Sequence, residues 1–174
     1  SLWSAVRDVL SPATPVTLTW DNGQGLQFTR RISINDDYLF VFEDAVTSSL
    51  PGDITLYPYG LVRRHGTPAT TGMYILHEGP LGVFDETLSE EDYDDLRDAG
   101  AAGIKMTPET AGGWVGITDK YWLAALLPTQ AKNYNFGFQS LAGNTDRYQV
   151  DFIDPNGLLL AAGGAITSKS RLFA

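Results

Sequence analysis

The side chains with the greatest potential for chemistry in this sequence are two histidines, one of which stands beside a glutamate. His65 follows the doublet Arg63-Arg64, and His77 precedes Glu78. Histidine is the side chain whose ordinary pKa lies nearest neutral pH, and a histidine with a carboxylate can run acid–base chemistry on a sugar ring. No further catalytic group is spaced around these residues. We therefore interpret both histidines as hydrogen-bonded strand or turn residues and assign neither them nor Glu78 to a site.

Other kinds of chemistry find little support in the residue types. The sequence contains no cysteine, which excludes disulfides, thiolate nucleophiles and cysteine-ligated zinc or iron–sulfur sites. Residues 85–98 carry eight acidic side chains and Arg97, but they lack the Asp-x-Asp-x-Asp-Gly order of a calcium loop, so we expect a solvated acidic surface. The glycine groups at 23–25, 100–103 and 112–113 lack the strand-then-helix context of a phosphate loop and predict turns. We predict no catalytic residue, no metal site and no cofactor, and we assign no residue to a binding site.

Composition and charge narrow the class of protein. A chain of 174 residues is long enough for one domain with a continuous core, and we expect residues 1–174 to form a single domain. The net charge of −9 repels phosphate backbones, so nucleic acid is excluded as a partner. No apolar run approaches the roughly 20 residues of a membrane span, and the first ten residues do not form a signal peptide. The segment itself is expected to be soluble.

The elements that must position any site are mostly strands. The 18 glycines and 9 prolines divide the chain into short segments with period-two alternation of apolar residues, which is typical of an all-β fold. Residues 16–34 predict a β-hairpin around the turn DNGQG, and the later strands are predicted in YLFVFEDAVTSS, ITLYPYGLVRRHG, MYILHEGPLGVF, GGWVGITD, YWLAALLP, NFGFQSL, RYQVDFI and LLLAAGGAI. Turns are expected at 119–120, 143–144 and 154–157.

Two short helices interrupt this pattern. The opening residues predict a short turn of helix that Pro12 and Pro15 terminate. A second helix is predicted after Ser89 as the N-cap, with acidic residues in its first turn and Tyr93, Leu96 and Ala99 on one face. Gly100 or Gly103 should end it.

The most aromatic run of the chain, residues 111–128, contains Trp114, Tyr121 and Trp122. Two adjacent strands joined near Asp119-Lys120 would bury one face and present the other to a second layer or a groove. An aromatic platform for a sugar or a peptide is the alternative. We favour central core strands.

Several segments together resemble the large periplasmic domain of the bacterial YidC membrane protein insertase family. They are VTLTWDNGQGLQFTR, ITLYPYGLVRRHGTP, MYILHEGPLGV, GGWVGITDKYWLAALLP and the ending SKSRLFA. The resemblance implies a β-super-sandwich similar to galactose mutarotase, with one or two short helices. It also implies that the chain is the C-terminal part of that domain, without its first strands and without the transmembrane insertase core.

The resemblance further implies a function. The parent protein would insert and fold inner-membrane proteins with or without the Sec translocon, and this segment would be a non-catalytic accessory domain in the periplasm. Its partners would be Sec components or nascent membrane proteins, and exposed sheet edges could pair copies of the fragment. The alternative is a carbohydrate-binding or mutarotase-like domain. From the charge of −9 we also expect the acidic helix to point away from the bilayer or toward a basic partner.

Overall fold

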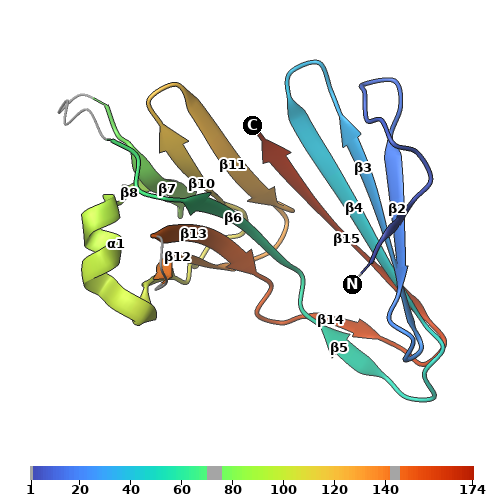
Figure 1. Cartoon of the computed structure of the whole chain (residues 1–174). Coiled ribbons are helices and arrows are strands. Elements are labelled where there is room, and N and C mark those ends of the chain that lie inside the picture. Colours follow the sequence, from blue (N-terminus) through green and yellow to red (C-terminus); the bar gives the residue numbers. More distant parts are fainter. Residues whose placement is uncertain (1, 70–75, 142–145) are drawn as a thin grey trace. The chain divides into compact units, whose positions relative to one another are not determined.

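The computed structural model describes residues 2–69, 76–141 and 146–174, and β-strands predominate among its regular elements (Figure 1). The chain divides into two compact units, Ser1–Pro58 with Asn156–Leu172 and Tyr59–Pro155 with Phe173–Ala174. The all-β prediction is therefore confirmed. That residues 1–174 act as a single domain stays a prediction.

The first unit contains a sheet in the order β1-β2-β3-β4-β15 and a separate two-stranded sheet of β5 and β14. The bounds are β1 Ser4–Ala5, β2 Val16–Asp21, β3 Leu26–Ile34, β4 Leu39–Ser48, β5 Ile54–Leu56, β14 Leu158–Leu160 and β15 Ala165–Phe173. The hairpin predicted at residues 16–34 is confirmed, since β2 and β3 pair in antiparallel register with Trp20 opposite Phe28. Its turn is held by Asn22, whose side-chain oxygen accepts from the backbone N–H groups of Gln24 and Leu26 at 2.8 and 3.0 Å.

The sheet of the first unit has one apolar face and one polar face, because side chains alternate along each strand. Cross-strand register places Trp20, Phe28 and Val46 in one row and Ile32 and Phe42 in another row of the same face. The opposite face carries mainly hydroxyl and charged side chains, namely Thr17, Thr19, Gln27, Thr29, Arg31, Ser33, Glu43 and Thr47. Nearly all of the apolar face is only half-buried.

The second unit is a sandwich of two antiparallel sheets with one short helix. One sheet has the order β11-β10-β7-β8, and the other has the order β6-β13-β12-β9. The bounds are β6 Tyr59–His65, β7 Gly79–Phe84, β8 Thr87–Glu90, α1 Tyr93–Ala99, η1 Gly100–Ala102, β9 Ile104–Met106, β10 Trp114–Asp119, β11 Trp122–Pro128, β12 Asn135–Leu141 and β13 Arg147–Ile153.

The core of the second unit lies between its two sheets. Phe84 of β7 contacts Phe136 and Phe138 of β12, with ring centroids 4.9 and 6.1 Å apart. Gly60 of β6 leaves room for the Phe152 ring of the neighbouring strand β13. A Cβ atom at position 60 would lie 2.6 Å from that ring. Aromatic and aliphatic side chains from both sheets are thus fully enclosed, among them Val115, Phe138, Tyr148 and Val150.

Four expectations about strands and helices are wrong in detail. Residues 4–5 are extended rather than helical, because they pair with β2; a short opening segment does not repay helix nucleation. The strand expected over residues 54–66 divides at Tyr57-Pro58 into β5 and β6, which belong to different sheets, as proline has no N–H to donate to a ladder. The strand expected over 158–166 divides at a turn in which Gly164 N–H donates to the Ala161 carbonyl at 2.9 Å.

The fourth correction concerns the start of the helix. Ser89 is not its N-cap, because Ser89 lies in β8 and pairs with Gly82. The N-cap is Asp92, while Gly100 ends the helix as predicted and Tyr93 and Leu96 are buried as predicted. Most other predicted strands are present, and the turn that joins β10 to β11 lies at Lys120-Tyr121, one residue after the expected position. Of the strand expected over residues 73–84, only Gly79–Phe84 is present, as β7; residues 76–78 are irregular. Residues 73–75 and the turn expected at 143–144 lie outside the described residues.

Candidate functional site

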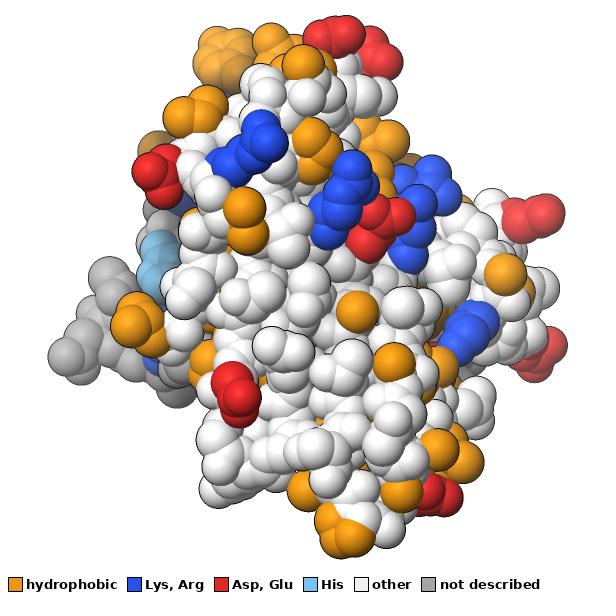
Figure 2. Space-filling model, turned by 90° about the vertical axis from the view of Figure 1, so that its right-hand side faces the viewer, with side chains coloured by type: hydrophobic (Ala, Val, Ile, Leu, Met, Phe, Trp, Pro, Cys, Tyr) orange, Lys and Arg blue, Asp and Glu red, His pale blue; other side chains and the backbone are white. Residues whose placement is uncertain are grey.

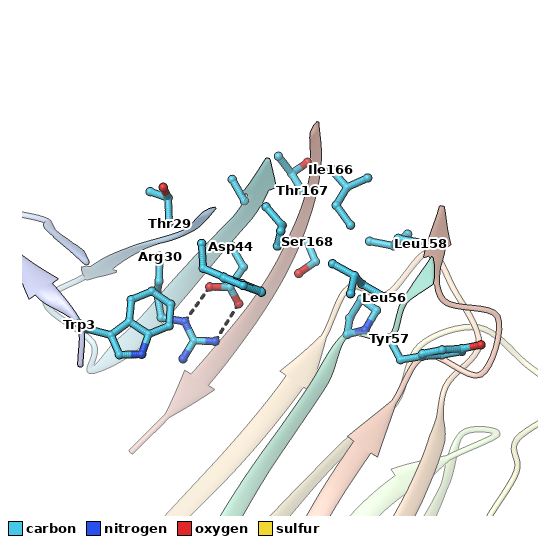
Figure 3. A pocket seen from close by; sticks show the side chains of 14 residues that line it. Trp3, Thr29, Arg30, Asp44, Leu56, Tyr57, Leu158, Ile166, Thr167 and Ser168 are labelled. Carbon is cyan, nitrogen blue, oxygen red and sulfur yellow. Dashed lines mark hydrogen bonds and ion pairs between the residues drawn. The ribbon is translucent and has the colours of Figure 1, made fainter. Parts of the chain in front are cut away.

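An open pocket of about 250 Å³ lies on the apolar face of the first unit. Its walls come from β3, β4, β5, β14 and β15 and from the segment that precedes β1 (Figure 3). The lining residues are Trp3, Phe28, Thr29, Arg30, Asp44, Ala45, Val46, Leu56, Tyr57, Pro58, Leu158, Ile166, Thr167 and Ser168. Most of these side chains are aliphatic or aromatic, so the pocket suits an apolar ligand group.

An ion pair forms the polar part of this pocket. Arg30 Nε and Nη2 donate to the two carboxylate oxygens of Asp44 at 2.6 and 2.9 Å, drawn as dashed lines in Figure 3. Hydrogen bonding of the Arg30 guanidinium to the Asp44 carboxylate raises the pKa of Arg30 above its ordinary value, although partial burial opposes the shift. The guanidinium also lies 5.6 Å from the centre of the Phe42 ring. The two charges neutralise each other, which lets them sit among apolar neighbours.

The chemical capacity of the pocket is binding rather than catalysis. Arg30 stays protonated at any physiological pH, and Asp44 already accepts both of its strong hydrogen bonds from Arg30. The lining holds no histidine to activate the hydroxyl of Ser168, and its one carboxylate, Asp44, is paired with Arg30. The pocket can therefore bury an apolar group and orient it, but it holds no set of residues for proton transfer.

The aromatic wall of the pocket extends across the sheet. Trp20 stacks on Phe28 with centroids 4.9 Å apart, and Trp3 lies 5.9 Å from Trp20. For residues 111–128 the sequence favoured core strands, with an aromatic platform only as the alternative. The sequence pattern that could have indicated the pocket is the alternation in LQFTRRISI. It places Arg30 on the same face of the strand as Phe28 and Ile32. The sequence alone did not single out Arg30 as a pocket residue.

The aromatic run at 111–128 is core only in part. Val115 and Leu126 are fully or nearly fully enclosed, as expected of central strands. The expectation is wrong for Tyr121 and Trp122, which are 85% and 59% exposed at the β10–β11 turn, and Trp114 is half-buried. The tight antiparallel turn at Lys120-Tyr121 places both rings at the end of the hairpin, beyond the reach of the core.

The two histidines lie in different surroundings. His65 is exposed at the end of β6. His77 Nε2 lies 3.0 Å from the Pro80 carbonyl oxygen, and its Nδ1 lies 4.0 Å from Asp92. Glu78 is buried at 8% exposure. His65 thus ends a strand, and His77 lies just before β7 with its ring near a backbone carbonyl.

The acidic run and the glycine groups have structural roles. Asp85 accepts hydrogen bonds from the backbone N–H and the hydroxyl of Thr110 at 2.8 and 2.7 Å, which lowers the pKa of Asp85. Gly112 and Gly113 both have a φ of 95° and form the turn before β10. Over residues 2–69, 76–141 and 146–174, no three His, Cys, Asp or Glu side chains gather as a metal site requires, and no helix has the length and apolarity to span a membrane.

A hydrogen-bonded polar cluster lies on the other unit, on the sheet face that points away from the core. The Gln149 side-chain amide donates to Asp151 at 2.6 Å and to the Tyr59 hydroxyl at 3.0 Å, and it accepts from Arg63. Tyr59 O–H donates to Asp151 at 3.3 Å. Gln149 and Asp151 are 5% and 8% exposed. Buried polar groups in this cluster are therefore hydrogen-bonded to one another, as burial requires.

This cluster predicts an abnormal tyrosine titration. Burial of the hydroxyl, followed by the charge of Asp151, raises the pKa of Tyr59 to about 12, although its ring is 48% exposed. Because the folded state holds this proton above the unfolded pKa of 10.0, stability should fall as pH rises between 10 and about 12. In Asp151→Asn, the pKa of Tyr59 should fall toward its ordinary value.

The measurement is the absorbance of tyrosinate at alkaline pH. Subtracting the titration of Tyr59→Phe from that of the parent protein isolates the signal of Tyr59, and the same subtraction in the Asp151→Asn background shows the effect of the charge. An unchanged midpoint in Asp151→Asn would rule out the charge of Asp151 as a cause of the raised pKa.

The chain matches a known protein family over its whole length. A family model described as the YidC periplasmic domain matches residues 1–174. The chain belongs to the YidC periplasmic domain family. A protein of Beijerinckia indica named membrane protein insertase YidC is 46% identical over 100% of this chain and 28% of its own length, and one of Bradyrhizobium diazoefficiens is 45% identical over 95% of this chain and 26% of its own length. The chain thus spans less than a third of the curated relatives it matches.

Structural comparison agrees with the fold expected for the YidC periplasmic domain. A crystal structure of an Escherichia coli K12 protein named "putative aldose 1-epimerase" matches with a TM-score of 0.62 at 10% identity, covering 99% of this chain and 68% of that one. At this identity the likeness shows the fold alone. The prediction of a mutarotase-like β-sandwich with short helices is confirmed. The relatives are insertases rather than enzymes, which supports the expectation that this chain catalyses no reaction.

Charged side chains are sparse on the face of the molecule shown in Figure 2. Most of that surface is white, and the blue side chains, most of them in the upper half and some beside red ones, form no broad basic patch. The net charge remains −9. This pattern offers no continuous track for a nucleic-acid backbone on that face.

Proposed function

We propose that this chain is a periplasmic, non-catalytic interaction domain of a YidC-type insertase that inserts and folds proteins of the bacterial inner membrane. The observation that carries the proposal is the pocket on the first unit, whose lining is mostly apolar and whose only charges, Arg30 and Asp44, are paired. Membrane proteins expose apolar side chains before they are inserted, and a pocket of about 250 Å³ can accept one or two of them.

The partners we propose are nascent membrane proteins and components of the Sec translocon, with the parent insertase acting alone or beside it. The relatives' name, membrane protein insertase, supports the first of these partners. Pairing of fragments through exposed sheet edges is a further expectation, since unpaired strand edges favour association. The carbohydrate alternative rests only on the fold, and the apolar lining of the pocket offers a sugar few hydrogen-bonding partners.

The test is site-specific photocrosslinking in the full-length insertase during synthesis of a known membrane-protein client. A photoreactive phenylalanine analogue replaces Tyr57, which lines the pocket and is 54% exposed. The matched control is Tyr38, which is 67% exposed in the β3–β4 turn and lies outside the pocket lining. We expect adducts with the client or with a Sec component at position 57 and at most background at position 38.

Deletion of the segment measures how central the domain is. Because we propose an accessory role, insertion of the client should be reduced but still detectable when the region equivalent to residues 1–174 is removed. Complete loss of insertion by an otherwise stable protein would show that this region performs the central step. Equal crosslinking at positions 57 and 38 would remove the pocket from the proposal.

A further inference from the structure

The sheet β6-β13-β12-β9 has an outer face whose composition differs from that of the chain as a whole. Its inner face carries Tyr148, Val150 and Phe152, which are at most 4% exposed. Side chains alternate along a strand, so the residues between these three point to the other side. Cross-strand register then places Arg147 with His65, Gln149 with Arg63, and Lys105 with Gly137 and Asp151 on this outer face.

Basic side chains predominate on this outer face. Arg63, His65 and Lys105 are exposed, and Arg147 shares their face. The only acidic side chain in the same rows is Asp151, which is 8% exposed and hydrogen-bonded to Gln149 and Tyr59. A chain with 21 acidic and 12 basic residues therefore presents a local excess of positive charge here. Local charge of this kind steers and orients oppositely charged partners.

The guanidinium of Arg63 is held in place. Its Nε and Nη2 both donate to the side-chain oxygen of Gln149, and Gln149 is in turn fixed by its bonds to Asp151 and Tyr59. This arrangement leaves Nη1 without a partner among the described residues. An arginine that is already ordered loses less side-chain entropy when it binds a carboxylate.

Apolar surface borders these cations. Tyr59 and Leu61 of β6 are 48% and 42% exposed on the same face. An exposed tyrosine and arginine side by side are typical of the centre of protein–protein interfaces, where both residue types are enriched. The face thus combines cations with contact area for a polypeptide.

The charge of the rest of the molecule decides between a membrane and a protein as the partner. A planar anionic bilayer would approach a wide area of a chain with a net charge of −9, and it would be repelled beyond this face. A narrow acidic segment of polypeptide touches the basic face alone, because screening limits its interaction to about 8 Å at physiological salt.

We propose that the outer face of β6, β13 and β9, centred on Arg63 and Lys105, docks an acidic segment of a partner polypeptide. This inference goes beyond the proposed function and does not depend on the apolar pocket. Carboxylates of the partner pair with Arg63 and Lys105, while Tyr59 and Leu61 contact its backbone and apolar side chains.

The test uses fluorescently labelled decaglutamate and the whole 174-residue chain. Binding is followed by fluorescence anisotropy at about 10 mM salt, where the Debye length is about 30 Å, and again at about 150 mM salt. The variant Arg63→Gln/Lys105→Gln is compared with Arg31→Gln/Lys169→Gln, which removes the same charge from the polar face of the first unit, where these residues are 49% and 56% exposed. A neutral glycine–serine peptide of equal length controls for non-specific binding.

We expect saturable binding of decaglutamate that weakens with salt. The Arg63→Gln/Lys105→Gln variant should lower the affinity about tenfold, and Arg31→Gln/Lys169→Gln should change it less than about twofold. Equal losses in the two variants, or no binding by the parent chain, would overturn the proposal. It would also be overturned if vesicles rich in phosphatidylglycerol, or a second copy of the chain detected by sedimentation, bound through these residues while decaglutamate did not.

Discussion

Leu96→Ala should lower the free energy of unfolding by about 2–5 kcal/mol. Leu96 is completely buried in α1, which packs against β12. Removing its side chain loses the transfer free energy of the missing atoms and leaves a cavity that a close-packed β-sandwich cannot fully close. The higher helix propensity of alanine recovers only a few tenths of a kcal/mol. Urea denaturation of the two proteins, followed by circular dichroism, measures the difference.

The matched control is Leu88→Ala in β8, where the leucine is 53% exposed. This substitution removes the same atoms from a position that water already reaches, so the change should stay within about 1 kcal/mol. Equal effects at positions 88 and 96 would mean that α1 does not close the core of the second unit in solution.

Arg64→Met should lower the free energy of unfolding by about 3 kcal/mol. Arg64 lies 3.0 Å from Asp119, and the two side chains are 28% and 11% exposed. The geometry is that of an ion pair rather than a directed hydrogen bond, because Arg64 Nε is buried without a hydrogen-bond acceptor. Methionine preserves much of the volume but leaves the carboxylate of Asp119 largely buried with the Tyr93 hydroxyl as its hydrogen-bond partner. The value is at the lower end for buried pairs because water still reaches Arg64.

Arg31→Met provides the comparison for this ion pair. Arg31 pairs with Glu43 at 2.8 Å, but both side chains are more than 40% exposed, and Glu43 also has Lys169 nearby. Exposed pairs of this kind contribute about 0–1 kcal/mol. Thermal and urea unfolding of both variants test the contrast, and a loss at position 31 as large as that at position 64 would contradict the assigned role of burial.

Much of the strand structure could be predicted because its cause is local. The hairpin at residues 16–34 could be predicted because its two signals are local. They are the period-two alternation of its strands and the turn-forming Asn22 between them. The breaks at Pro58 and Gly163 were visible as residue types. Their consequence was not, because assigning β5 and β6 to different sheets depends on partners about 100 residues away in β14 and β13.

The candidate site shows the same limit. Side chains alternate along β3, so Phe28, Arg30 and Ile32 are expected on the same face of the sheet. The charge of Arg30 can lie on this apolar face because it pairs with Asp44 of β4. The residues that enclose the face as a pocket come from β14 and β15, near the other end of the chain. No local pattern encodes that convergence.

The sequence by itself determined the fold class, the absence of cysteine chemistry, the acidic net charge and the family, since each follows from residue types and short-range periodicity or from segments compared directly. Tertiary structure alone decided which side chains meet: the pocket around Arg30 and Asp44, the exposure of Trp122, and the basic face around Arg63. The physical reason is that strand pairing brings together residues far apart in the chain, and burial, hydrogen bonding and charge depend on those neighbours rather than on the residue's own type.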